Sequence, residues 1–100
     1  MKKLSLKLFF ILHASLISQE IDHIFKTYKD GQKWYEGHLK DGKVDGLFTF
    51  WYRNGQKSYE ENYKNGLRNG KFTGWFENGN ISSEKFFKNN KREGKWTTWY

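Results

Sequence analysis

Tryptophan recurs every 24 residues in this chain, at Trp51, Trp75 and Trp99. A row of indole rings suits flat partners such as sugars, peptides or lipid headgroups, because these can stack on aromatic faces. Periodic aromatic residues more often serve packing, with each ring lying over its own stretch of chain. We favour the packing interpretation and keep the three residues as candidate binding residues.

Three lysines recur with the same spacing, at Lys40, Lys64 and Lys88. A stripe of ammonium groups would attract anionic lipid headgroups. Charged residues along an exposed sheet also keep it from associating with other sheets, and we favour this interpretation. The three lysines nevertheless complete the candidate binding surface.

Three glutamates share the spacing as well, at Glu36, Glu60 and Glu84. General acid–base catalysis needs carboxyl groups whose environments push their pKa values apart, and a row of equivalent positions offers a single environment. We therefore expect these carboxylates to pair across strands with Thr49 and Thr73 and to balance nearby lysines.

The remaining residue patterns predict neither an enzyme nor a metal site. The histidines do not follow the repeat and have no flanking ligand pattern; they are His13, His23 and His38. The chain has no cysteine, and it contains no motif for a catalytic nucleophile or a phosphate-binding loop. We expect a non-enzymatic protein without catalytic residues, metal or cofactor.

Turn signals indicate which elements must position these residues. Asn-Gly or Asp-Gly recurs every 24 residues, at 30–31, 54–55 and 78–79. Such a pair between strand-like runs, here exemplified by 56–64 and 71–77, predicts a two-residue type I′ hairpin turn with positive φ at both positions. The second connection, 65–70, is also rich in Asn and Gly, but its geometry stays open.

A two-residue turn at Asn54-Gly55 predicts the register of the hairpin. It pairs Arg53 with Gln56, and therefore also Trp51 with Ser58, Phe50 with Tyr59, and Phe48 with Glu61. Because side chains alternate across a strand, a ring-rich face should gather Phe48, Phe50, Tyr52, Tyr59 and Tyr63. The opposite tryptophan face should carry Trp51, Thr49, Ser58 and Glu60. We expect the ring-rich face to be buried and the half-polar tryptophan face to be exposed.

The repeats predict an all-β fold in one domain, residues 19–100. A half repeat at 22–30 is followed by full repeats at 31–54, 55–78 and 79–100. The result is a sequential meander of about seven strands. Since Tyr100 lies at the end of a strand, we expect a sheet edge that pairs with another protein or a second copy.

Residues 1–18 are typical of an export signal. Met1-Lys2-Lys3 is a basic start, an apolar stretch runs from Leu8 to Ile17, and Ser18-Gln19 suits cleavage. The alternative is a strand or short helix that packs on the domain. We expect a protein of the periplasm, the cell envelope or the exterior, with the cytoplasm as the alternative location.

The net charge of +7 suggests nucleic acid as a partner. Residues 1–18 contribute three of the basic residues, and without them 15 basic residues face 11 acidic ones, a net charge of +4. The acids are also interspersed with the bases, which is typical of a soluble surface. Nucleic acid is therefore an unlikely partner.

The repeat has a family resemblance. Gly-Lys-Phe-Thr-Gly-Trp-Phe-Glu-Asn-Gly at 70–79 and Tyr-Lys-Asn-Gly at 63–66 resemble the MORN repeat. More narrowly, they resemble the bacterial MORN variant, whose members are often labelled antitoxins of toxin–antitoxin systems. Tyr35-Glu36-Gly37 matches the Tyr-x-Gly start of the standard unit, whereas Glu61 and Lys85 replace its glycine.

The resemblance covers about residues 24–100 and implies an elongated, single-layer antiparallel sheet of stacked hairpins. Asn90 stands where Gly42 and Gly66 predict glycine, and the turn should survive because Asn tolerates a left-handed conformation.

The resemblance also implies contact with membrane phospholipids, scaffolding of proteins or dimerisation. A repeat sheet offers a long surface without a preformed pocket, so we expect a protein-interaction or scaffold module. The alternatives are an antitoxin-like protein that neutralises a partner toxin, and peripheral binding to anionic lipid.

Overall fold

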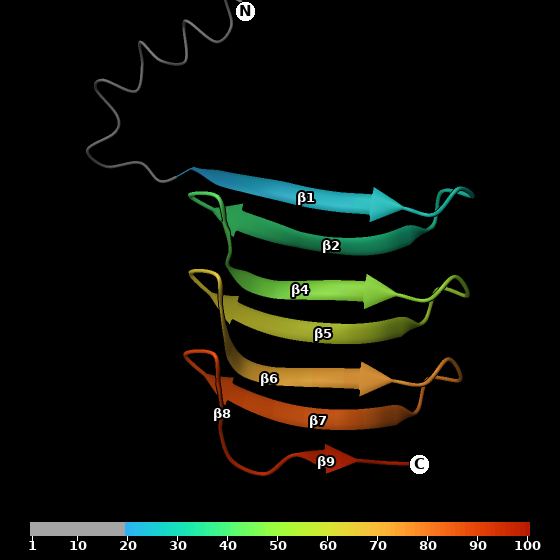
Figure 1. Cartoon of the computed structure of the whole chain (residues 1–100). Helices are drawn as coiled ribbons and strands as arrows, with labels where there is room; N and C mark the ends of the chain where they lie inside the picture. The colour runs from blue at the N-terminus through green and yellow to red at the C-terminus, as the bar shows by residue number, and fades with distance from the viewer. Residues whose placement is uncertain (1–19) are drawn as a thin grey trace, which may run out of the picture.

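The computed structural model describes residues 20–100 as one open antiparallel sheet of nine strands (Figure 1). The strands are β1 (Ile21–Thr27), β2 (Lys33–Lys40), β3 (Lys43–Val44), β4 (Gly46–Trp51), β5 (Lys57–Lys64), β6 (Leu67–Trp75), β7 (Ile81–Lys88), β8 (Lys91–Arg92) and β9 (Thr97–Thr98). They follow the order β1-β2-β4-β5-β6-β7, while β3 pairs with β2, and both β8 and β9 pair with β7. The predicted export signal lies outside the described residues.

The predicted all-β meander is confirmed. Its seven strands correspond to β1, β2, β4, β5, β6, β7 and β9. The additional strands β3 and β8 are two residues long and belong to the hairpin tips. Residues 20–100 contain no helix that is long and apolar enough to cross a membrane.

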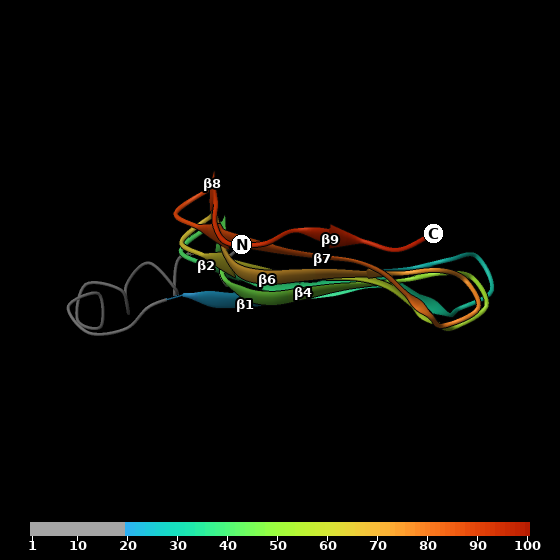
Figure 2. The same ribbon diagram turned by 90° about the horizontal axis from the view of Figure 1, so that it is seen from below.

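The sheet is a single thin layer, with extents of 54 × 37 × 13 Å, and Figure 2 shows it edge-on. Two packed sheets would lie about 10 Å apart, and side chains on both outer faces would add further thickness. Within residues 20–100, Phe87 is the one large apolar side chain that is buried, at 7% exposure.

The expected contrast between a buried ring-rich face and an exposed tryptophan face is wrong, although Phe87 on the ring-rich face is buried. Tyr59 on that face is 50% exposed, whereas Thr49 and Thr73 on the tryptophan face are each 8% exposed. The physical reason is that no second layer covers either face, so neighbouring side chains decide burial. Thr49 lies between Glu36 and Glu60 on adjacent strands, and these longer side chains flank the threonine.

The predicted type I′ turn at Asn54-Gly55 is also wrong. Tyr52 N–H donates to Gln56 O (2.8 Å) and Gly55 N–H donates to Tyr52 O (3.0 Å), which leaves three residues in the loop. Gly55 has positive φ (90°) and Asn54 does not. Instead, the Asn54 carboxamide accepts the Gln56 N–H at 2.9 Å, which stabilises a type I turn that ends in a left-handed glycine.

The type I′ turns lie at the other connection of each unit. Both central residues have positive φ in all three turns: Asp41-Gly42, Asn65-Gly66 and Asn89-Asn90. The expectation for Asn90 is confirmed, because its φ is 72°. Lys64 pairs with Leu67 directly across the turn at Asn65, as a two-residue hairpin requires.

A β-bulge compensates for the longer loop. Trp51 pairs with Lys57 and not with Ser58, and the register then shifts by one residue. As a result, the predicted pairs of Phe50 with Tyr59 and Phe48 with Glu61 are confirmed. A bulge places two consecutive side chains on one face.

Ser58 therefore lies on the ring-rich face, and its predicted place on the tryptophan face is wrong. Ser58 lines the same hollow as Phe50, Tyr52 and Tyr59.

Candidate functional site

The tryptophan column, which consists of Trp51, Trp75 and Trp99, forms a row on the tryptophan face. Lysines lie over two of its rings. Lys33 Nζ lies 5.4 Å from the Trp51 ring centroid, and Lys57 Nζ lies 5.7 Å from that of Trp75. The equivalent position in the last unit is Ile81, and Trp99 is 42% exposed. Each lysine thus places its cation where a stacking ligand would lie.

The glutamate column neutralises these lysines. Lys33 Nζ lies 2.6 Å from Glu36 Oε1, and Lys57 Nζ lies 2.6 Å from Glu60 Oε2. The expected balance between glutamates and lysines is confirmed, and so is the cross-strand pairing with threonine. The bulge explains the spacing of three residues, because it brings the lysine and the glutamate onto one face.

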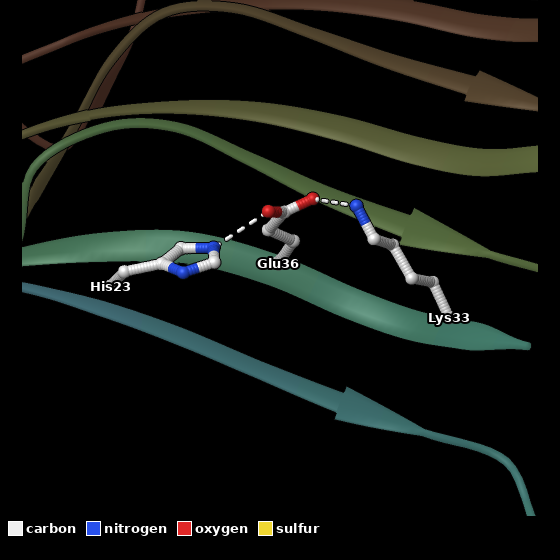
Figure 3. A network of polar contacts seen from close by, with 3 residues as sticks. All are labelled: His23, Lys33 and Glu36. Carbon is white, nitrogen blue, oxygen red and sulfur yellow. Dashed lines mark hydrogen bonds and ion pairs between the residues drawn. The ribbon is translucent and has the colours of Figure 1, made fainter. Parts of the chain in front are cut away.

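One of these ion pairs extends into a network of three residues, His23, Glu36 and Lys33 (Figure 3). His23 Nε2 lies 2.6 Å from Glu36 Oε2, and the His23 ring also lies against His38, with ring centroids 5.1 Å apart. The hydrogen bond from Lys33, followed by that from His23, lowers the pKa of Glu36.

The sequence reasoning missed His23, although a signal was present. His23 lies two repeats before Lys71 and is therefore its equivalent. Lys71 Nζ lies 3.0 Å from Glu84 Oε2, so a basic residue at this position pairs with the glutamate column, which consists of Glu36, Glu60 and Glu84. Residues 20–100 contain no group of three or more His, Asp or Glu side chains arranged to hold a metal ion.

The lysine column, which consists of Lys40, Lys64 and Lys88, lies at the other end of the sheet from the tryptophan column. Lys40, Lys64 and Lys88 end β2, β5 and β7, next to the type I′ turns. Trp51 and Trp75 end β4 and β6, next to the three-residue loops at the opposite end of the sheet (Figure 1). Because neighbouring strands are antiparallel, the six candidate residues form two separate rows and not one site.

The ring-rich face carries two groups of packed rings. The first group is Tyr28, Trp34, Tyr35, Phe48 and Phe50, and the second is Tyr63, Phe72, Phe87 and Trp96. In the first group, the Phe48 ring leaves no space over Gly37, where an added Cβ would lie 2.5 Å from Cδ2. This contact gives the Tyr-x-Gly glycine a structural role.

Five further cations lie over rings of the ring-rich face, and the sequence reasoning missed all of them. Lys26 covers Trp34, Arg53 covers Tyr28, Arg68 covers Phe87, and both Lys85 and Arg92 cover Trp96. The four ion pairs of the described chain involve none of these cations. The two faces therefore differ: the cations over Trp51 and Trp75 are paired with carboxylates, whereas the five cations over the ring-rich face are not.

Shallow hollows on the ring-rich face repeat with the array. One is lined by Tyr28, Trp34, Phe50, Tyr52 and Tyr59, among others. A second, lined by Phe76, Ser82, Thr98 and Tyr100 among others, occupies the equivalent position 48 residues further on. On the same face, burial and a hydrogen bond to Glu61 raise the pKa of Tyr63 to about 12.

The comparisons with known proteins identify the repeat. The family model described as "MORN repeat variant" matches twice, at residues 44–65 and 68–89. Neither the curated proteins nor the solved structures that were compared with the chain gave a match. The matched segments contain β4–β5 and all but the first residue of β6–β7, and they start 24 residues apart, in agreement with the 24-residue period of the sequence. These two segments of the chain are therefore MORN repeats of the variant type.

Proposed function

We propose that this protein is a non-enzymatic interaction module that binds another protein on its ring-rich face. One observation carries the proposal: a single-layer sheet leaves a face of packed aromatic rings without a covering layer, with Trp34 40% and Tyr59 50% exposed. Aromatic residues and arginine are enriched where proteins bind each other. MORN repeats are also associated with protein and membrane interaction.

The shape of the surface favours a protein over a small molecule. Small-molecule sites bury most of the ligand surface in a concave pocket. The hollows around Tyr59 and Phe76 are shallow and lie along an extended face. The absence of catalysis is part of the proposal, and the engagement of Glu36, Glu60 and Glu84 in ion pairs with lysine or histidine supports it.

The edges of the sheet offer a second route for a protein partner. In residues 20–100, β1 is the outermost strand at one end of the sheet. Such a strand presents unpaired backbone N–H and C=O groups along its outer side. A strand from another protein, or β1 of a second copy, would pair with these groups and extend the sheet.

Photo-cross-linking in the native host tests the ring-rich face. Tyr59 (50% exposed) and Leu47 (45% exposed) lie on opposite faces of adjacent strands, and each would be replaced by benzoylphenylalanine. We expect a discrete cross-linked protein from position 59 and none from position 47. Cross-links from position 47 alone would assign binding to the tryptophan face, and none from either position would contradict binding on a face.

We further propose that the protein is exported, because residues 1–18 combine a basic start, an apolar stretch and a suitable cleavage position. Intact-mass measurement of the protein from host cell fractions tests this. A mass without residues 1–18 outside the cytoplasm would support export. A full-length cytoplasmic protein would contradict it and favour the antitoxin-like alternative.

Anionic lipid is the second candidate partner, and one observation favours it. Lys40, Lys64 and Lys88 lie at the same end of the sheet, and Lys43 and Lys91 pair with two of them. Juxtaposed basic residues attract anionic membranes at low ionic strength. Co-sedimentation with phosphatidylserine vesicles, lost when the three column lysines become Gln, would support this candidate. Equal co-sedimentation of the variant would exclude it.

A further inference from the structure

Two cations converge on one ring in the last unit. The Arg92 guanidinium lies 4.2 Å and the Lys85 ammonium 5.2 Å from the centroid of Trp96. The ring is held in place, because Trp96 Nε1 donates to Phe86 O at 3.0 Å and the indole packs on Phe87. Two like charges near one ring repel each other, and an anion between them would remove this cost.

The chain itself shows how such a cation over tryptophan is neutralised. On the tryptophan face, Lys57 lies over Trp75 and its ammonium also contacts the Glu60 carboxylate at 2.6 Å. Lys33, Trp51 and Glu36 repeat this arrangement one unit earlier. Within residues 20–100, the side chains of Lys85 and Arg92 make neither an ion pair nor a hydrogen bond.

The site is specific to the last unit. Positions equivalent to Lys85 hold Gly37 and Glu61, and positions equivalent to Trp96 hold Phe48 and Phe72. The second unit thus carries a carboxylate where the last unit carries an ammonium. A ligand that recognises this site would bind at one end of the array and not to every repeat.

We propose that Lys85 and Arg92, held over Trp96, bind a carboxylate from an acidic peptide segment of a partner protein. The inference rests on the proposed interaction function and names the chemistry of its partner. A guanidinium that stacks by its face keeps its N–H edge free for a bidentate contact with carboxylate. The two carboxylate complexes on the opposite face favour this anion over phosphate.

A neighbouring apolar residue of the partner completes the contact. Lys85 also lines the hollow that Phe76, Thr98 and Trp99 help to form on the same face. In an extended segment, side chains two residues apart point to the same side. A segment whose glutamate reaches Lys85 and Arg92 therefore places an apolar side chain two residues away near this hollow.

Fluorescence anisotropy with a synthetic peptide tests the proposal. The probe is a fluorescein-labelled octapeptide, Glu-Glu-Val-Val-Glu-Glu-Val-Val, compared at low ionic strength with the same peptide carrying glutamine in place of glutamate. We expect the glutamate peptide alone to bind. Lys85→Gln and Arg92→Gln should each weaken binding by about tenfold, because each removes a direct contact with the carboxylate. Lys57→Gln, which removes the same charge from above another tryptophan, should change affinity by less than about twofold.

Each other outcome overturns the proposal. Equal losses for Lys57→Gln and Lys85→Gln would mean attraction by net charge alone, and absence of binding to the wild type would exclude an acidic peptide. Binding of inorganic phosphate or of phosphatidylserine vesicles through Lys85, without peptide binding, would assign the site to phosphate. None of these results affects the cross-linking experiment at position 59, which tests the proposed function independently.

Isotope-labelled protein provides a measurement that does not depend on a variant. The indole N–H signal of Trp96, assigned with Trp96→Phe, should shift more than those of the other four tryptophans on addition of the glutamate peptide. Phe is the native residue at the two equivalent positions, so this variant should fold. A larger shift at Trp51 or Trp75 would refute the site.

Discussion

At the scale of the residue, a tyrosine hydroxyl group of one unit donates a hydrogen bond to the backbone of the next unit. Tyr28 Oη donates to Trp51 O at 2.7 Å, and Tyr52 Oη donates to Trp75 O at 2.6 Å. The equivalent residue in the next unit is Phe76, which has no hydroxyl group to donate to Trp99 O. The connection between units is therefore weaker at the end of the array, and two substitutions can measure its contribution.

Tyr52→Phe should lower the free energy of unfolding by about 1 kcal/mol, because it leaves a backbone carbonyl without its donor. Phe76→Tyr should raise the free energy by a smaller amount, since it offers a donor to Trp99 O. Urea denaturation followed by circular dichroism measures both. Equal stability of Tyr52→Phe and wild type would show that the hydroxyl contributes nothing.

Glu36 gives the protein a pH-dependent contact at the same scale. Its pKa is lowered from 4.5 by Lys33 and then His23. Because the pKa of Glu36 is lower in the folded state, its ionised carboxylate stabilises the fold above pH 4.5. This stabilisation is lost as the pH falls through the folded-state pKa and the carboxylate becomes protonated.

Glu36→Gln should therefore reduce stability slightly at pH 6 and have no effect near pH 2, since the pair is at the surface. Thermal denaturation across this pH range measures the difference. Glu77→Gln, on an exposed glutamate without an ion pair, is the control. A constant difference between wild type and Glu36→Gln at all pH values would exclude the ion pairs as its cause.

At the scale of the element, two kinds of turn alternate along the array. Three-residue loops follow β1, β4 and β6, and type I′ turns follow β2, β5 and β7. Asn-Gly occurs in both kinds, at Asn54 and at Asn65. The difference is the φ of the asparagine, which is positive (49°) only at Asn65.

Proline distinguishes the two turns. Arg53 occupies the second position of a type I turn, where proline is favoured, so Arg53→Pro should preserve the sheet. Asn65→Pro should lower the free energy of unfolding by about 3 kcal/mol or more, because proline cannot adopt positive φ. It also removes the N–H that Asn65 donates to Asp45 Oδ1.

Circular dichroism during urea denaturation compares the two proline variants. If Arg53→Pro were as damaging as Asn65→Pro, the type I assignment of the three-residue loop would be wrong.

For the whole molecule, stability should vary along the sheet. β5 and β6 each have a long strand on both sides, whereas β1 pairs with β2 alone among residues 20–100. In a repeat array each unit contacts only its neighbours, and edge elements open at lower free energy than central ones.

Amide hydrogen exchange should therefore be slowest in β5 and β6 and fast in β1. If a second copy pairs with β1, raising the protein concentration should slow exchange in β1 and leave β5 unchanged. Uniform protection across all strands would contradict nearest-neighbour stability. Concentration-independent exchange in β1 would argue against self-association at this edge.

The sequence by itself determined the period, the all-β meander and the membership of each column. Glu36, Glu60 and Glu84 could be expected to balance nearby lysines because they share the 24-residue period, but the partner of Glu84 is Lys71, since Ile81 stands at the position equivalent to Lys33 and Lys57. The pairing of Phe50 with Tyr59 was also predicted correctly, although from a two-residue turn that the structure does not contain. The prediction held because the bulge offsets the extra residue of the longer loop.

Only the tertiary structure decided the turn types, the burial and the cations over rings. Asn-Gly permits more than one turn, and the hydrogen bond between Tyr52 and Gln56 selects among them. Lys85 and Arg92 reach Trp96 from separate strands, so their convergence depends on register and not on sequence spacing. Burial depended on the single layer: with no second sheet, most rings stay partly exposed, and the buried side chains are Phe87 and three short polar residues, Thr49, Ser58 and Thr73.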